Sequence, residues 1–231
     1  MDILVTVGPR LTEELRYCLR SIEANLPHGD IWMLGNVPTW ATNAVRPCRT
    51  SQQKDAHTNV KSNLRWFLDD PATPDEFYLF NDDFFVMEPI KSVPAMHLGS
   101  LEGHVARLRA MSCSPHGAYV IALECTLAAL RVAGHDDPLS YEAHVPMQMT
   151  KDGLSRTLDF IGHRVRLHER SVYAALHNLE GSYITDVKVW EPTHKIPDGP
   201  FLSTNNQSFA RLAVGRHIRD RFPTPCRYER T

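Results

Sequence analysis

The sequence has few cysteines, and none of them are paired at short spacing. Only five of the 231 residues are cysteine, and they lie far apart along the chain. Zinc sites need ligands at short, paired spacings, and small disulfide-stapled domains need an even, dense set of cysteines. The sequence therefore predicts neither a zinc site nor a disulfide framework, and it favours a reducing compartment.

The chain also lacks a long apolar run and a strong excess of one charge. No apolar segment approaches the ~20 residues that cross a bilayer, and the first residues lack the pattern of a signal peptide. There are 25 Lys and Arg against 27 Asp and Glu, for a formal net charge of −2. Nucleic-acid and membrane binders usually carry a strongly basic face. We expect a cytoplasmic protein with no membrane span, and the sequence predicts no oligomeric state.

Two common phosphate-binding motifs are absent as well. The chain has no Gly-x-Gly-x-x-Gly segment and no Gly-Lys-Ser/Thr loop, which disfavours a Rossmann dehydrogenase and a P-loop enzyme. What it does have is the composition of an ordinary globular protein, with 42% hydrophobic and 23% charged residues. That share of apolar residues is enough to offset the entropy of ordering the chain.

The first part of the chain has the pattern of a strand, a helix and a second strand. Residues 3–7 are apolar and β-branched and end at a Gly-Pro turn, residues 11–26 carry apolar side chains at helical spacing, and residues 30–35 are again strand-like. The crossover is long enough to join two parallel strands. We therefore predict an α/β fold with a mostly parallel sheet flanked by helices.

The rest of the chain continues this alternation without a linker or a low-complexity segment. Residues 36–54 and 91–118 show no period and are predicted as loops. One domain, residues 1–231, is expected. The further predicted elements are helices at about 55–68, 120–132, 151–161 and 207–221, and strands at 77–80 and 183–189.

Asn81, Asp82 and Asp83 stand between two apolar segments, 77–80 and 84–87. Two carboxylates there repel each other in a low dielectric, and a divalent cation removes that repulsion. Hard oxygen ligands at a strand end suit Mg²⁺ or Mn²⁺ that also binds waters and substrate phosphates. We predict Asp83 and Asp82 as metal ligands. The alternative is a β-hairpin turn, in which the three residues supply only turn chemistry.

Several segments, in order along the chain, match the conserved regions of one family. Residues 14–27 (ELRYCLRSIEANLP), 31–34, 37–40 and 78–85 (YLFNDDFF) match its second region. Residues 142–147 (EAHVPM) are similar to its third-region His-x-Pro motif, and 201–206 and 222–229 match its fourth. These segments resemble the Stealth family of sugar-phosphate transferases. Short proteins of this kind also look like bacterial and phage glycosyltransferases of the GT-A fold.

The resemblance implies a single GT-A-like domain, in which residues 1–90 bind the nucleotide sugar and metal and residues 91–231 form the acceptor-side and catalytic half. It implies a UDP-linked nucleotide-sugar donor, and Mn²⁺ or Mg²⁺ as cofactor. The acceptor is a glycan, a protein or modified DNA. Implied catalytic residues are His144 as base or acceptor contact, Asp82, and Arg170 beside the leaving group. The implied donor-binding residues are Gly8, Arg10, Arg16, Asn59, Lys61, Asn81 and Lys188.

Several of these assignments have a structural alternative. The alternative for Arg170 is a surface arginine, and that for His144 is a surface histidine without a role. Asn59 and Lys61 are equally consistent with a solvated helix face. For Arg10 the alternative is a solvated charge.

The sequence departs from the family pattern in two places. The first strand ends in residues 7–10 (VGPR) rather than Trp-Val-Asp/Asn-Gly, and Thr204, Asn205 and Asn206 stand where Leu-Asn-Asp is typical. We therefore predict a metal-dependent glycosyltransferase that moves a sugar to an acceptor hydroxyl. One alternative is Stealth-type transfer of hexose-1-phosphate with release of a nucleoside monophosphate. A second is an inactive module that binds a glycan or a nucleotide.

Overall fold

The structure is a computed structural model that describes residues 1–231 except 49, 51–55, 112–116, 163–165, 193–194 and 231. The chain forms two compact units. The predicted halves, 1–90 and 91–231, differ from these units because two later segments return to the first unit. The first unit contains Met1–Val93, His144–Thr150 and Val187–Thr231, and the second contains Pro94–Ala143 and Lys151–Asp186.

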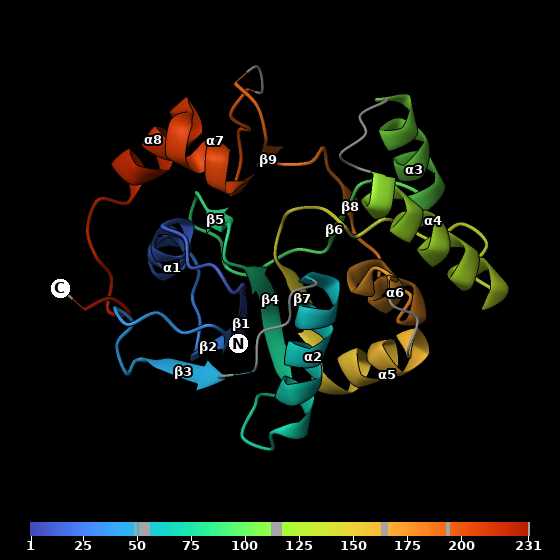
Figure 1. Ribbon diagram of the computed structural model, residues 1–231, viewed down its shortest axis with the longest axis horizontal. Helices are drawn as coiled ribbons and strands as arrows, with labels where there is room; N and C mark the ends of the chain where they lie inside the picture. Colours follow the sequence, from blue (N-terminus) through green and yellow to red (C-terminus); the bar gives the residue numbers. More distant parts are fainter. Residues whose placement is uncertain (49, 51–55, 112–116, 163–165, 193–194, 231) are drawn as a thin grey trace. The chain divides into compact units, whose positions relative to one another are not determined.

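A five-stranded sheet forms the centre of the first unit (Figure 1). The strand order is β3-β2-β1-β4-β7, and every neighbouring pair is parallel except β4 and β7. The prediction of an α/β fold with a mostly parallel sheet flanked by helices is confirmed. The strands are β1 (Asp2–Val7), β2 (Ile31–Gly35), β3 (Val45–Cys48), β4 (Glu76–Asn81) and β7 (Met147–Thr150).

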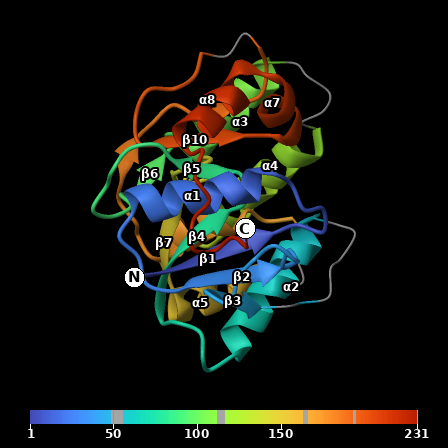
Figure 2. The same cartoon turned by 90° about the vertical axis from the view of Figure 1, so that its left-hand side faces the viewer.

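Helices cover both faces of this sheet, which explains why its central strands are apolar throughout. Helices α1 (Glu14–Asn25) and α2 (Ala56–Asp69) lie on opposite faces (Figure 2). In β1, Ile3, Leu4 and Val5 are fully buried, as expected for a parallel strand that is covered on both sides.

A smaller three-stranded sheet lies on the α1 side of the first unit (Figures 1 and 2). It has the order β5-β10-β9, from β5 (Phe84–Val86), β10 (Phe201–Thr204) and β9 (Lys188–Val189). The unit ends with α7 (Asn206–Arg211) and α8 (Ala213–Arg221). The ring of Phe209 on α7 stacks on that of Phe85 on β5, with the ring centroids 5.9 Å apart. The ring of Tyr17 on α1 is tilted against Phe209 at a centroid distance of 5.6 Å.

The second unit is mainly helical. Helix α4 packs against α3 and α6, and α6 also packs against α5. In the part of the chain that the structure describes, no helix combines the length and apolar character needed to cross a membrane. The elements are β6 (Met96–His97), α3 (Leu101–Ala110), α4 (Gly117–Val132), α5 (Lys151–Ile161), α6 (Glu169–Leu176) and β8 (Ser182–Tyr183).

Several predicted elements differ from the structure. The loop predicted over 36–54 contains β3, whose two middle residues are exposed, so an edge strand of this kind shows no apolar run. The loop predicted over 91–118 contains α3, and the strand predicted over 183–189 is divided between β8 and β9. The predicted helix start near Asp55 lies outside the described residues.

The helix predicted over 207–221 is broken at Leu212, whose backbone is extended. After this break α8 turns back against α7. A Cβ atom on Gly215 would lie 1.7 Å from the Phe209 carbonyl oxygen, so this close approach requires glycine. The break therefore depends on a contact between helices, which helical periodicity does not reveal.

Candidate functional site

Asp82 and Asp83 form the connection between the two sheets of the first unit. β4 pairs with β1 and β7, whereas β5 pairs with β10, so in the described chain these segments are not the arms of one hairpin. The hairpin alternative is therefore wrong. Gly8 follows β1 at the same edge, because Thr6 pairs in register with Asn81. β2 and β3 extend from one side of β1 and β4 lies on the other, and α/β proteins bind ligands at such a switch point.

Acidic side chains cluster at this edge. Burial, followed by the charges of Asp83 and Glu14, raises the pKa of Asp82 to about 7. Glu14, in the first turn of α1, is only 1% exposed and accepts a 2.5 Å hydrogen bond from the Thr204 hydroxyl. Burial raises the pKa of Glu14 as well, Asp83 adds to this rise, and Thr204 and Lys188 oppose it. We call Glu14, Asp82, Asp83 and Lys188 the Asp82 cluster.

Lys188 supplies the positive charge of the Asp82 cluster. Its Nζ donates to Asp83 Oδ2 at 2.8 Å, and the two side chains are 9% and 19% exposed. Asp83 Oδ1 is buried and has no hydrogen-bond partner among the described residues. One carboxylate oxygen is thus paired with an ammonium, and the other is left for a further cation or donor.

The residues present fit a magnesium or manganese ion that takes most of its ligands from substrate and water. In the described part of the chain, no group of three or more His, Cys, Asp or Glu residues is arranged around a metal position. Mg²⁺ sites, however, often use one or two carboxylates together with substrate phosphates and several waters. Asp82 and Asp83, with the unpaired Oδ1 of Asp83, provide that minimal set.

His144 joins this site through aromatic contacts. Its ring lies edge-on to the rings of Phe84 and Trp190, at centroid distances of 6.4 Å and 5.6 Å. Lys188 Nζ lies 4.6 Å from the centre of the Trp190 ring. His144, Trp190, Lys188 and Asp83 therefore form a continuous series of contacts within the first unit. The sequence predicted His144, Lys188 and Asp83 for the same site, and the structure brings them together.

Arg170 belongs to the second unit, where it lies in the first turn of α6. It is 6% exposed, so the alternative of a surface arginine is wrong. Beside it, Glu142 accepts hydrogen bonds from the backbone and hydroxyl of Ser171 at 3.1 and 3.0 Å and pairs with His168. Burial alone would raise the pKa of Glu142, but His168, Arg170 and the Ser171 hydrogen bonds outweigh it and hold that pKa below its ordinary value. The role of Arg170 at a leaving group stays a prediction.

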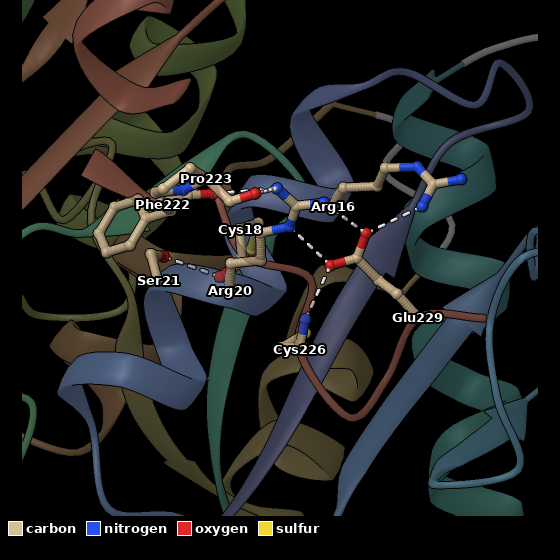
Figure 3. Close-up of polar contacts among 8 residues, drawn as sticks. All are labelled: Arg16, Cys18, Arg20, Ser21, Phe222, Pro223, Cys226 and Glu229. Carbon is tan, nitrogen blue, oxygen red and sulfur yellow. Dashed lines mark hydrogen bonds and ion pairs between the residues drawn. The ribbon is translucent and has the colours of Figure 1, made fainter. Parts of the chain in front are cut away.

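Arg16 belongs to a second, separate charge cluster around Glu229 (Figure 3). Its Nη1 pairs with Glu229 at 2.8 Å, and its guanidinium stacks over Trp40 at 4.2 Å. Arg20 donates to both carboxylate oxygens of Glu229 at 2.6 and 2.9 Å, and the backbone N–H of Cys226 donates to Glu229 Oε1 at 3.1 Å. We call these residues the Glu229 cluster. Donor binding by Arg16 stays a prediction, and its observed contacts hold the C-terminal segment on α1.

The other predicted donor-binding residues have varied surroundings. Asn59 on α2 is 4% exposed, so a solvated helix face is wrong for this residue, while Lys61 is half-buried. Asn81 Oδ1 accepts a 3.2 Å hydrogen bond from the Thr6 hydroxyl, which links β4 to β1. Arg10 is exposed in the loop after β1. Their contacts with a donor stay predictions.

The sequence did not identify Glu14 or Thr204 as site residues. Glu14 was interpreted as a favourable acid in the first turn of a helix. The available signal was its position four residues before Cys18, which places both on one helix face, and Cys18 is fully buried. A buried acid of this kind needs a partner, and that partner, Thr204, comes from the opposite end of the chain.

No known protein family matches the sequence, and no curated protein does. Among solved structures, two of the galactosyltransferase LgtC are similar. An active-site mutant has a TM-score of 0.48, and a complex with donor and acceptor sugar analogs has a TM-score of 0.47. Both are 12% identical in sequence, and each alignment covers 99% of this chain and 85% of the other. Because both TM-scores are below 0.5, the fold is assigned from the strand order of this chain, and its function is proposed from the residues of its site.

Proposed function

We propose that the protein is a glycosyltransferase that moves a sugar from a UDP-linked nucleotide-sugar donor to an acceptor hydroxyl, with Mn²⁺ or Mg²⁺ as cofactor. The observation that supports this most is the Asp82 cluster. It combines neighbouring carboxylates, an unpaired buried oxygen on Asp83 and a lysine at the switch point of a parallel sheet. Perturbed acids in such a position are typical of functional sites.

Asp82 and Asp83 are the residues that would hold the cation. Burial, followed by repulsion from Asp83 and Glu14, raises the pKa of Asp82 to about 7, so a bound divalent ion would relieve an unfavourable arrangement of charges. Such an ion supplies positive charge for the leaving diphosphate.

The protein's own residues would perform the remaining steps. Lys188, held by Asp83 and Trp190, places a fixed ammonium beside the position of the diphosphate, where it stabilises the developing negative charge. His144 accepts the proton of the acceptor hydroxyl as its oxygen bonds to the anomeric carbon. The bond from that carbon to the diphosphate breaks, and a nucleoside diphosphate leaves. The role of Arg170 as a phosphate contact stays a prediction from the sequence.

Membership of the Stealth family, with transfer of hexose-1-phosphate, is the second candidate. The third and fourth regions of the resemblance support it, but one feature favours sugar transfer. Asn205 caps α7 through hydrogen bonds to the backbones of Gln207 and Ser208, and Asn206 is exposed. Neutral amides thus occupy the segment where a carboxylate is typical, and Asn205 is used to stabilise a helix.

Product analysis tests these proposals directly. The protein is incubated with Mn²⁺ and UDP-glucose, UDP-galactose or UDP-N-acetylglucosamine, and the released nucleotide is identified by chromatography. UDP supports sugar transfer, and UMP supports hexose-1-phosphate transfer instead. Binding of a nucleotide sugar without either product supports the inactive module.

Two variants show whether the Asp82 cluster is responsible for nucleotide release. Asp83→Asn is expected to lower nucleotide release about 100- to 1,000-fold. Asp75→Asn is the matched control, because Asp75 is an exposed aspartate just before the other end of β4. Equal loss of release in both variants would contradict the assignment, as would equal retention.

A further inference from the structure

One face of the three-stranded sheet carries an exposed aromatic ring beside the Asp82 cluster. In the sheet register, Ser203 of β10 lies opposite both Phe84 of β5 and Lys188 of β9, so these three side chains share a face. Trp190 follows two residues after Lys188, and the Lys188 ammonium lies over its ring. Trp190 is 40% exposed.

The Trp190 ring is held in place from two directions. The Lys188 ammonium lies 4.6 Å from its centre, and Lys188 is itself fixed by its 2.8 Å hydrogen bond to Asp83. The His144 ring meets Trp190 nearly at right angles, at 5.6 Å. Since these contacts fix the indole before any ligand arrives, little side-chain entropy is lost when a ligand packs on its exposed surface.

We infer that Trp190 is the stacking platform for a pyranose ring. Trp190 is not among the residues predicted from the sequence to bind the donor, the metal or the acceptor, and this inference rests on the proposed glycosyltransferase function. One face of a pyranose presents C–H bonds that pack on an aromatic ring, while its hydroxyls project from the rim. An aromatic side chain with a few convergent polar groups is typical of small-molecule sites. Here the polar groups beside the ring are the His144 imidazole, the Lys188 ammonium and the Asp83 carboxylate.

The position of His144 favours a sugar over a nucleobase. His144 is the proposed base for the acceptor hydroxyl, so the ring that carries that hydroxyl must lie within reach of the imidazole. Trp190 is the exposed aromatic ring in contact with His144, at 5.6 Å. A sugar that stacks on Trp190 therefore presents its rim hydroxyls to His144, which a stacked base would not do.

Ligand-observed NMR tests the platform without any need for turnover. Saturation-transfer difference spectra are recorded with methyl β-D-galactopyranoside, methyl β-D-glucopyranoside, methyl N-acetyl-β-D-glucosaminide and uridine as probes. At least one glycoside is expected to show saturation, strongest at the C–H protons of one ring face. Trp190→Ala is expected to weaken this binding about tenfold, because the aromatic contact area is lost.

Three further variants make the result specific. Trp190→Phe keeps an aromatic ring and is expected to retain most of the signal, whereas Trp190→Leu keeps apolar volume without a flat ring and is expected to lose it. The leucine variant also keeps the test valid if the alanine variant does not fold. Trp66→Ala is the matched control, because Trp66 on α2 is 38% exposed, and its signal is expected to equal that of the wild type.

Three outcomes would overturn the platform. They are the absence of saturation for every glycoside, equal glycoside signals in the wild type and both Trp190→Ala and Trp190→Leu, and loss of the uridine signal alone. Failure of the proposed function gives a different pattern. In that case no nucleotide is released from any donor, while the glycoside signal still depends on Trp190.

Discussion

Helix α1 contributes to two charge clusters that are built in opposite ways. In the Glu229 cluster, a carboxylate that is 5% exposed is bonded by Arg16, Arg20 and a backbone N–H. Although burial raises the pKa of Glu229, these bonds lower it to about 2. In the Asp82 cluster, burial and then the neighbouring acids raise the pKa of Asp82 to about 7, and one oxygen of Asp83 has no partner among the described residues.

The difference separates a structural role from a functional one. Breaking a buried, fully paired ion cluster leaves an uncompensated charge, so removal of one partner from the Glu229 cluster destabilises the folded chain. Acids that are held together without full compensation destabilise the folded chain, and such arrangements persist at functional sites. The first cluster fastens the C-terminal segment to α1, as Figure 3 shows, and the second is the one for which we propose a ligand.

Asp83→Asn is expected to produce the largest change in activity. Nucleotide release should fall about 100- to 1,000-fold, because the carboxylate that would hold the divalent cation beside the leaving diphosphate is lost. The free energy of unfolding should remain near that of the wild type, since the lost pairing with Lys188 is offset by weaker repulsion from Asp82. Steady-state kinetics and urea denaturation measure the two quantities. A large loss of stability with full activity would place Asp83 with the structural cluster.

Glu229→Gln is expected to have the opposite effect. The free energy of unfolding should fall by about 3 kcal/mol, because two arginines lose their charged partner in a buried position. Glu13→Gln is the matched control, since its pair with Arg219 is exposed and should contribute less than about 1 kcal/mol. Urea denaturation of both variants tests this, and equal losses would contradict a special role for burial at Glu229.

The pH dependence of stability sharpens the contrast. The folded pKa of Glu229, about 2, lies below the ordinary value of 4.5, so its stabilising contribution is complete above pH 4.5 and is lost as the pH falls toward 2. This predicts a decrease of about 2 kcal/mol between pH 7 and pH 3 from Glu229 alone. Denaturation at a series of pH values should show a shallower slope for Glu229→Gln, and an unchanged slope would refute the pairing.

Asp82→Asn is expected to change stability only slightly, and with the opposite sign to Glu229→Gln. Removing one of the repelling charges should raise the free energy of unfolding by about 1 kcal/mol while activity is lost, as in other stability–function trade-offs. Thermal melting and nucleotide release measured on the same preparation test this. A destabilised variant would show that the Asp82 carboxylate is compensated in the folded protein.

Local patterns predicted the framework of the first unit well. Residues 3–7, 30–35 and 77–80 were predicted as strands, and β1, β2 and β4 confirm them, because buried parallel strands are continuous apolar runs. The prediction did not separate the short strand β9 from β8, and it missed β10. Strands of two to four residues obtain their order from pairing partners, and their own sequence carries little periodic signal.

The candidate site was predicted in part. Asp82, Asp83, His144 and Lys188 were named from the sequence, and the structure joins them within one unit. Glu14 was not, because an acid in the first turn of a helix ordinarily faces solvent and favours the helix dipole. Arg16 was predicted to bind the donor phosphate, and in the structure it pairs with Glu229. Because the two residues are far apart in the chain, no local sequence pattern predicts this contact.

The sequence by itself determined the α/β class, the apolar strands and the presence of two carboxylates at a strand end, because these depend on the spacing of residues close together in the chain. Only the tertiary structure decided that β4 and β5 enter different sheets, that Lys188 and Thr204 reach Asp83 and Glu14, and that Trp190 stands exposed beside His144. Those contacts join segments far apart in the chain, and their free energy depends on burial and on the charges that surround each group once the strands have paired.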